Sequence, residues 1–302
     1  MKTLLAAITA TTLALAPSPS PDGLNQSLDP RQPVASGRTV LQAGHVDLGP
    51  RYQDNRWTIQ VHDGTAVPSV WRQPSEVVLR VRDAAIERVP DDPAYAFLEQ
   101  TAGTPVYVVP QTQNQDVVWL GWNTQEPGVM ASVTRGVTMH LLGVQGPGSV
   151  VTYLQSGNLG APQVLWHSAR PYPQPLWVET NTHTHANWIF SKPGVYLLAI
   201  EITADLVDGR QVSGRDMLRF AVGDSASADE AFTAAFAGRL PSTGATPPAA
   251  AAPARESAAG GPGVGTVALV AAAVLLVALL VWLSIRGARA RRRAIDEPEA
   301  RS

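Results

Sequence analysis

The chain has no cysteine in its 302 residues. That absence excludes disulfide bonds, thiolate metal sites and cysteine nucleophiles. Lysine occurs only at positions 2 and 192, so arginine carries nearly all of the positive charge. Histidine is scarce too, with six residues, and any local grouping of histidines is therefore informative.

Common catalytic patterns are also missing from the sequence. It contains no Gly-x-Ser-x-Gly elbow, no His-Glu-x-x-His motif and no glycine loop of the kind that holds phosphate. The formal net charge of −2 includes an arginine cluster near the C-terminus, so the preceding part of the chain is acidic. An acidic domain does not favour nucleic acid as a partner. The sequence therefore predicts a protein that is not an enzyme and does not bind nucleic acid.

The N-terminal segment has the layout of a secretory signal peptide. Lys2 precedes an uncharged apolar run that ends in the small-x-small pattern Ala14-Leu15-Ala16. Pro17 follows directly and is unfavourable at a cleavage site, so the pattern predicts export without settling the position of the cut. We expect residues 1–16 to be a signal peptide, and the Pro- and Ser-rich residues 17–39 to be disordered.

The C-terminal region has the pattern of a membrane anchor. Residues 264–285 carry no charge, and at about 1.5 Å per residue a helix of that length crosses roughly 30 Å of hydrocarbon. Five arginines cluster at the start of the tail that follows, residues 286–302. Such a cluster stays on the cytoplasmic side, so we expect a single-pass protein of the cell membrane with its N-terminal part outside the cell.

Residues 224–263 are dominated by Ala, Pro, Gly and Ser, which is typical of a flexible stalk. Within it, Leu240-Pro241-Ser242-Thr243-Gly244 fits the Leu-Pro-x-Thr-Gly signal by which sortases cut between Thr and Gly and link a protein to peptidoglycan. The long spacer before the apolar run and the long tail depart from the usual layout of that signal. Covalent attachment to the cell wall by sortase and simple membrane anchoring both stay open.

Residues 40–223 show short runs of alternating apolar and polar residues, separated by turn residues. In Glu76-Val-Val-Leu-Arg-Val-Arg82, for example, the apolar side chains face one way and the arginines the other. Asp208-Gly209 indicates a hairpin, and Asp92-Pro93 the start of a helical turn. We expect an all-β domain, an antiparallel immunoglobulin-like β-sandwich. Tyr196 then fits either a tyrosine corner or an ordinary core position.

Two pairs of residues at spacing two carry the candidate chemistry. His183 and His185 lie on the same face of a strand, because side chains alternate across it, and His45 and Asp47 repeat this arrangement. Brought together, they would offer three imidazoles and a carboxylate, which suits zinc or a similar divalent ion. They could equally be surface residues of two unrelated strands.

The remaining candidates are single residues. His62, His140 and His167 each stand alone, so we expect ordinary structural positions for them. The tryptophans of the domain fit either the apolar core or a sugar-binding face, and the core is the simpler interpretation. They are Trp119, Trp122, Trp166, Trp177 and Trp188.

Four stretches of the domain resemble a known family. They are GHVDLGP (44–50), VVPQTQNQDVVWLGWNTQ (108–125), GVQGPGSVVTYLQSGNLGAPQVLW (143–166) and HTHANWIFSKPGVYLLAIEITA (183–204). On these motifs the chain is similar to actinobacterial surface-anchored proteins with a choice-of-anchor M domain. Members of that family are encoded near an ABC transporter similar to metal importers, so the resemblance implies a role connected with metal and supports His45, His183 and His185 as ligands.

These patterns together predict a cell-surface binding protein that captures a divalent metal, zinc or manganese, or a metal-containing ligand, for an ABC-type importer. The three histidines would bind as neutral imidazoles, with Asp47 as fourth ligand or as the acceptor that orients one of them. The alternative is an adhesive or scaffolding module that binds protein or cell-wall glycan through exposed aromatics and loops. A third interpretation is an ion that only stabilises the sandwich.

Overall fold

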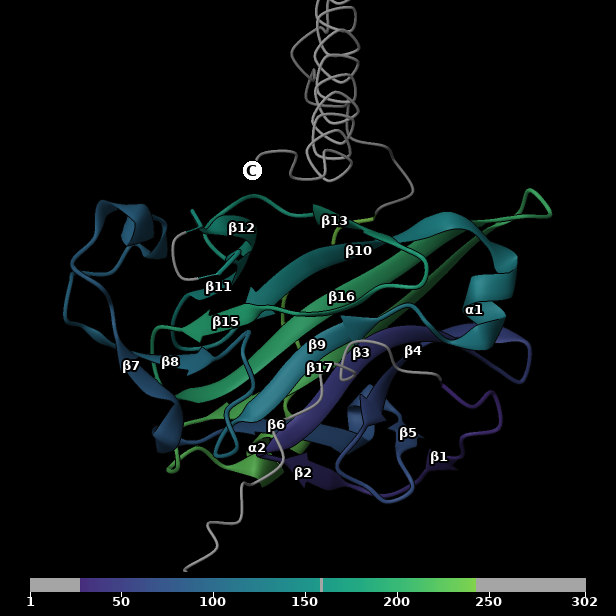
Figure 1. Cartoon of the computed structure of the whole chain (residues 1–302). Coiled ribbons are helices and arrows are strands. Elements are labelled where there is room, and N and C mark those ends of the chain that lie inside the picture. Colours follow the sequence, from purple (N-terminus) through teal and green to yellow (C-terminus); the bar gives the residue numbers. More distant parts are fainter. Residues whose placement is uncertain (1–27, 158–159, 243–302) are drawn as a thin grey trace, which may run out of the picture. The chain divides into compact units, whose positions relative to one another are not determined.

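The structure, a computed structural model, describes residues 28–157 and 160–242. Within this part of the chain most regular structure is β-strand, which confirms the all-β prediction (Figure 1). The predicted signal peptide, most of the stalk, Thr243 and Gly244, the apolar run 264–285 and the tail lie outside the described residues. Among the residues described, no helix has the length and apolar character needed to cross a membrane.

Sheet A consists, in hydrogen-bonded order, of β1 (Val34–Ala35), β5 (Val70–Arg72), β4 (Arg56–Asp63), β3 (Gly44–Gln53), β9 (Val118–Asn123) and β14 (His183–His185). The hairpin between β3 and β4 turns at Asp54 and Asn55, which both have positive φ. A two-residue turn that matches the strand twist requires this conformation, and Asp and Asn adopt it readily. β9 pairs with β3 in parallel and with β14 in antiparallel orientation. It therefore lies between the two strands that carry the candidate ligands.

Sheet B consists of β13 (Gln174–Glu179), β10 (Val133–Gln145), β16 (Gly194–Leu206), β17 (Gln211–Val222), β6 (Val77–Val81) and β2 (Thr39–Leu41). β16 and β17 form a long hairpin whose turn contains Gly209 at positive φ, which confirms the predicted hairpin. β6 pairs in parallel with both β17 and β2.

Sheet C consists of β12 (Gln163–His167), β11 (Val150–Leu154), β15 (Asn187–Phe190), β8 (Pro105–Val109) and β7 (Ile86–Arg88). The chain passes from sheet A to sheet C at Ala186, between the end of β14 and the start of β15. Sheets A and C thus share a continuous stretch of chain.

The apolar core lies between sheet B and the other two sheets. One cluster of buried side chains unites Leu48 of sheet A, Ile200 of sheet B and Trp188 of sheet C. The indole N–H of Trp57 on β4 donates a hydrogen bond to the carbonyl of Ile202 on β16, at 3.0 Å. The sheets therefore form a sandwich-like arrangement in which sheets A and C pack against sheet B.

The helices are short. They are η2 (Pro74–Glu76), η3 (Asp83–Ala85), η4 (Pro93–Leu98), α1 (Pro127–Ser132) and α2 (Ala228–Thr233). Asp92 accepts a hydrogen bond from the backbone N–H of Ala94 at 2.8 Å, as a helix cap does, which confirms the predicted helical turn.

Tyr196 adopts the geometry of a tyrosine corner. Its ring is fully buried, and its hydroxyl donates a 2.7 Å hydrogen bond to the carbonyl of Lys192, four residues upstream. The bond fixes the chain where it enters β16 after the turn at Pro193 and Gly194.

The antiparallel prediction needs correction, because the sheets are mixed. β1–β5, β2–β6, β3–β9 and β6–β17 are parallel pairs. Alternating polarity shows which face of a strand is buried, but it carries no information on the direction of its neighbour. That direction depends on long-range packing and on the connections between strands.

The predicted boundaries of the domain need correction at both ends. The segment expected to be disordered contributes β1 and the first residue of β2, and the backbone N–H of Trp71 donates to the carbonyl of Pro33 at 2.9 Å. The expected stalk begins with α2, whose Ala231 is fully buried against Val78 and Ala221. Alanine-rich sequence resembles a linker in composition, but here it lets a helix approach the sheet closely.

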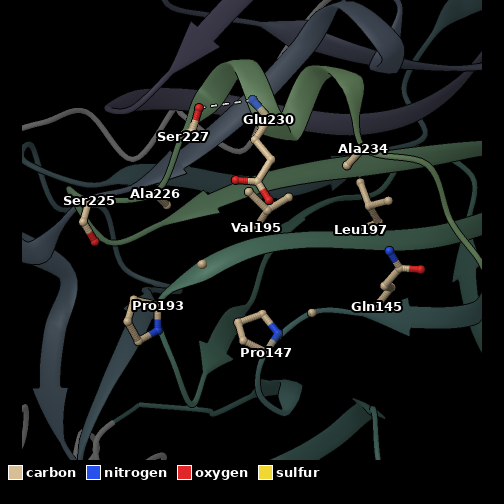
Figure 2. Close-up of a pocket in the computed structure, with 12 residues that line it drawn as sticks. Gln145, Pro147, Pro193, Val195, Leu197, Ser225, Ala226, Ser227, Glu230 and Ala234 are labelled. Atoms are coloured by element: carbon tan, nitrogen blue, oxygen red, sulfur yellow. Dashed lines mark hydrogen bonds between the residues drawn. The ribbon is translucent and has the colours of Figure 1, made fainter.

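A groove lies between α2 and the ends of β10 and β16 (Figure 2). Ser227 caps the helix by accepting a 3.2 Å hydrogen bond from the backbone N–H of Glu230. The groove is lined mainly by small and apolar residues, with Glu230 as its carboxylate and without histidine. It does not offer the ligand set that the sequence predicts for a metal.

Candidate metal centre

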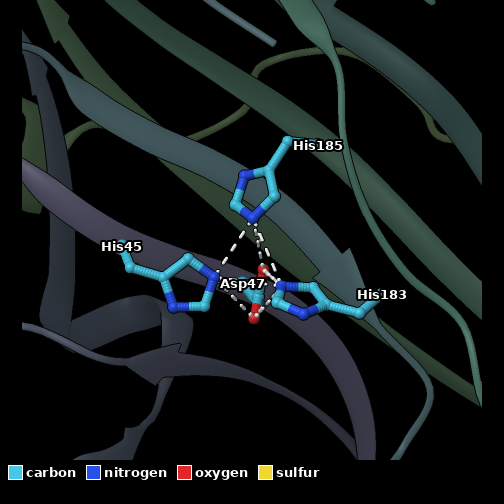
Figure 3. A group of neighbouring side chains, drawn as sticks. All are labelled: His45, Asp47, His183 and His185. Atoms are coloured by element: carbon cyan, nitrogen blue, oxygen red, sulfur yellow. Dashed lines mark hydrogen bonds and ion pairs between the residues drawn. The ribbon is translucent and has the colours of Figure 1, made fainter. Parts of the chain in front are cut away.

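The four residues predicted as metal ligands meet in space, although His45 and Asp47 are more than a hundred positions away from His183 and His185 (Figure 3). β3 supplies His45 and Asp47, and β14 supplies the histidine pair. The register across β9 places Asp47 opposite Gly121, and Gly121 opposite His185. The side chains therefore project from the same face of sheet A.

Gly121 makes the approach of the two outer strands possible. A Cβ atom at this position would lie 2.8 Å from both Asp47 Oδ1 and His185 Nδ1, and 2.5 Å from the carbonyl oxygen of Thr184. Any other residue would fill the space in which the ligands converge. A glycine inside an apolar strand often marks a close approach, so the sequence does contain a signal for the role of Gly121.

The three imidazoles point the same nitrogen at one another. His45 Nε2 lies 3.0 Å from His183 Nε2 and 3.1 Å from His185 Nε2, and the latter two atoms are 3.2 Å apart. Three nitrogens in a triangle cannot all be satisfied by one another, because each carries either one proton or one lone pair. Such a group of nitrogens could hold a shared metal ion at its centre.

The carboxylate of Asp47 completes the group. Its Oδ1 and Oδ2 lie 3.1 Å and 3.0 Å from His183 Nε2, and its Oδ2 lies 3.3 Å from His45 Nε2. Oδ2 is buried and receives no hydrogen bond. A buried carboxylate oxygen in this state needs a positive partner.

The spacing of these atoms fits a metal ion. Ligands of a tetrahedral ion with bonds of about 2.0–2.1 Å lie about 3.3 Å apart. The nitrogens and carboxylate oxygens here lie 3.0 to 3.6 Å apart. Three imidazoles and one carboxylate suit zinc and the other first-row divalent ions better than calcium or magnesium, which prefer oxygen.

Electrostatics hold the ligands in the forms that bind metal. Burial alone would raise the pKa of Asp47, but its close contacts with the imidazoles of His183 and His45 hold that pKa well below its usual range. Burial lowers the pKa of His185 to about 3, against the opposing attraction of Asp47. At neutral pH the carboxylate is therefore ionised and His185 is neutral, and both offer free electron pairs.

Trp119 forms one wall of the centre. Its indole stacks on the ring of His185 with centroids 3.6 Å apart and an angle of 9° between planes, and its centroid lies 5.2 Å from that of His45. The indole N–H donates to the carbonyl of Gln111 at 2.9 Å, which fixes the ring. The sequence favours a core position or a sugar-binding face for Trp119 and does not predict this contact with the candidate ligands.

The single histidines lie outside the ligand set. His62 is fully buried on β4, opposite Asp47 in register, with its ring 4.9 Å from that of Trp71. His140 lies on β10 in sheet B, and His167 Nε2 lies 3.0 Å from the carbonyl of Phe97. These positions agree with the expectation that the three single histidines are ordinary structural residues.

Trp122, Trp166 and Trp188 belong to the core, as expected. Trp177 on β13 departs from the expectation, because it is 52% exposed and carries the guanidinium of Arg135 over its ring at 5.9 Å.

No family model matches the chain, and comparisons with curated proteins and with solved structures find no match either. The assignment of the centre therefore rests on its geometry.

Proposed function

We propose that the protein captures one divalent first-row metal ion, zinc or manganese, at the cell surface and presents it to an ABC-type importer in the same membrane. His45, His183 and His185 bind the ion through Nε2, and Asp47 supplies the fourth ligand. The observation that carries the proposal is the convergence of three imidazole Nε2 atoms and one buried carboxylate oxygen on a single point. The surface location is supported by the signal peptide and membrane span that the sequence predicts and by the resemblance to choice-of-anchor M proteins.

A binding role fits the centre better than catalysis does. Catalytic zinc sites keep an open coordination position for water or substrate, whereas four protein ligands close the shell. Here four side chains from two strands converge, and three of them are buried. The immunoglobulin-like sandwich, the stalk and the membrane span are parts of the same proposal, since they would hold this centre outside the cell.

The alternative is an adhesive or scaffolding module with a structural ion. The observation that favours it is Trp177, whose large apolar ring is exposed at the edge strand of sheet B. Exposed aromatic rings stack on sugars and on protein side chains. In this case the ion would stabilise the fold, and the binding surface would lie elsewhere.

Metal analysis of the purified full-length chain tests the proposal. We expect close to one transition-metal ion per chain in the wild type and none in the His183→Ala/His185→Ala double variant. His140→Ala is the matched control, because it removes a histidine from a strand of sheet B outside the cluster and should keep the ion. A wild type that stays metal-free after incubation with zinc and manganese at neutral pH would rule the proposal out.

A cell-surface assay separates capture from a structural role. If the ion is captured for import, cells that carry the double variant should accumulate less metal at limiting supply, while binding of cells to wall glycan is unchanged. If Trp177 serves adhesion, Trp177→Ala should weaken glycan or cell binding and leave metal uptake unchanged.

A further inference from the structure

The four ligands differ in their access to solvent. The side chain of His45 is 15% exposed, whereas those of Asp47 and His183 are fully buried and that of His185 is 2% exposed. An ion that reaches the centre from outside must therefore pass beside His45.

The β4 side of His45 carries no side chain that covers its ring. The pairing of β3 with β4 starts at Val46, so His45 has no partner side chain on β4. Gly64 lies there instead, donating its N–H to the carbonyl of His45 at 3.0 Å. A Cβ atom on Gly64 would come within 2.9 Å of His45 Nδ1, so the glycine leaves the space that the ring occupies. On the other side the ring meets Trp119 at a tilt of 49°.

The other ligands are enclosed by neighbours across the sheet. Asp47 lies between His62 of β4 and Gly121 of β9. His183 lies opposite the buried Asn123, and His185 is stacked on Trp119. None of these side chains can leave its place without disturbing the packing of a neighbouring strand.

We infer that His45 is the exchangeable ligand: it swings aside to admit or release the ion, while Asp47, His183 and His185 form a fixed base of three ligands. This inference rests on the proposed metal-binding function and adds its route of loading and unloading. When His45 leaves, the open position faces solvent, so an incoming imidazole can replace it. The accepting partner would therefore be a protein that offers a histidine side chain at the rim beside Trp119 and Gly64.

Exchange of one ligand while the other three stay in place has a physical advantage for a protein that transfers its ion to a partner. Release of one ligand leaves the ion bound by two nitrogens and a carboxylate, so the ion is never free in solution during transfer. Affinity changes of this kind appear mainly in the dissociation rate.

Replacement of single ligands in the full-length chain tests the inference. The probe is zinc, and its release is followed by the absorbance of a chromogenic chelator. We expect His45→Ala to retain zinc at stoichiometric loading but to release it roughly tenfold faster or more, and free imidazole to restore slow release. His183→Ala is the matched control. It should hold no zinc with or without imidazole, because the space it leaves is closed to solvent.

The outcomes separate the two levels of the proposal. A wild type without zinc rejects the metal centre itself. A wild type that binds zinc, with His45→Ala as empty as His183→Ala or with imidazole acting equally on both variants, rejects His45 as the exchangeable ligand only. Circular dichroism checks that each variant is folded, and His183→Asn replaces His183→Ala if the latter is not.

Discussion

Two buried carboxylates in this protein lie beside histidines, one on sheet A and one on sheet B, and they obtain their positive partners in different ways. Asp47 faces His45, His183 and His185. Glu201 on β16 is the register partner of His140 on β10 and is also almost fully buried. Its Oε1 accepts hydrogen bonds from the guanidinium of Arg215, at 2.8 Å, and from the hydroxyl of Ser213, at 2.6 Å.

The difference lies in the source of the positive charge. Glu201 is neutralised by an arginine of its own sheet, which is charged at every physiological pH. Asp47 is surrounded by imidazoles, and His185 among them is held neutral by burial. A carboxylate enclosed in this way is stable only if a cation comes from outside the chain or if the histidines take up protons.

A histidine beside a buried acid therefore does not by itself indicate a metal. On sheet B a single imidazole meets a carboxylate that is already paired. On sheet A three imidazoles direct the same nitrogen to one point, and the carboxylate faces that point with both oxygens. It is convergence without a protein cation that distinguishes the candidate metal centre.

The largest expected effect is on zinc affinity, when the carboxylate of Asp47 is replaced with an amide. Asp47→Asn removes the only anionic ligand of the cluster. We therefore expect zinc affinity to fall at least about 100-fold, which corresponds to about 2.8 kcal/mol of binding free energy. Titration with zinc in competition with a chelator measures the loss.

Glu201→Gln is the counterpart on sheet B. It leaves Arg215 without its partner and should lower the free energy of unfolding by about 1–2 kcal/mol, while zinc affinity stays at the wild-type value. Equal loss of zinc affinity in the two variants would remove the distinction between the carboxylates.

A smaller effect is expected from closing the space between the ligand strands. In Gly121→Ala the new methyl group meets Asp47, His185 and the backbone of Thr184, so the two outer strands must move apart. Misplacement of ligands by their surroundings weakens metal binding by roughly 10–100-fold, and the same zinc titration detects it.

The control for this substitution is Gly214→Ala on β17, where the nearest atom, in the side chain of Trp57, lies 3.2 Å from the new Cβ. That variant should bind zinc as the wild type does. Unchanged zinc affinity in Gly121→Ala would show that the cluster does not need the glycine.

Local pattern predicted each half of the centre, but not how the halves meet. The spacing of two placed His183 with His185, and His45 with Asp47, on common strand faces, because alternation depends only on backbone geometry. The strand between them, β9, pairs with β3 in parallel and with β14 in antiparallel orientation, and no local signal specifies such pairings. Gly121 and Trp119 gained their roles only through that pairing.

The limits of the domain show the same division between local and long-range causes. Composition predicted a disordered start and a stalk, because Pro, Ser and Ala dominate there. Val34 and Ala35 nevertheless form β1 beside Trp71 and Arg72 of β5, and Ala231 packs closely because it is small. Composition describes what a segment can do alone, whereas burial against a distant strand decides what it does in the fold.

The smallest expected effect is on stability at low pH, and it depends on His62 of sheet A. Burial lowers the pKa of His62 to about 4, from an ordinary value of 6.5. The unfolded chain therefore binds more protons than the folded chain between these two values. The stability that comes from a neutral His62 is complete above pH 6.5 and is lost as pH falls toward 4.

For the metal-free protein, replacing His62 with leucine should remove this part of the acid sensitivity. Both nitrogens of His62 are buried without a hydrogen-bond partner, so an apolar side chain of similar size does not forfeit a contact. Between pH 7 and pH 4.5 we expect the free energy of unfolding to fall by on the order of 1–3 kcal/mol less in His62→Leu than in the wild type. Urea unfolding at the two pH values measures the difference. Parallel pH dependence in the two proteins would mean that His62 takes up its proton without cost to the fold, and that the acid response of sheet A belongs to the ligand histidines.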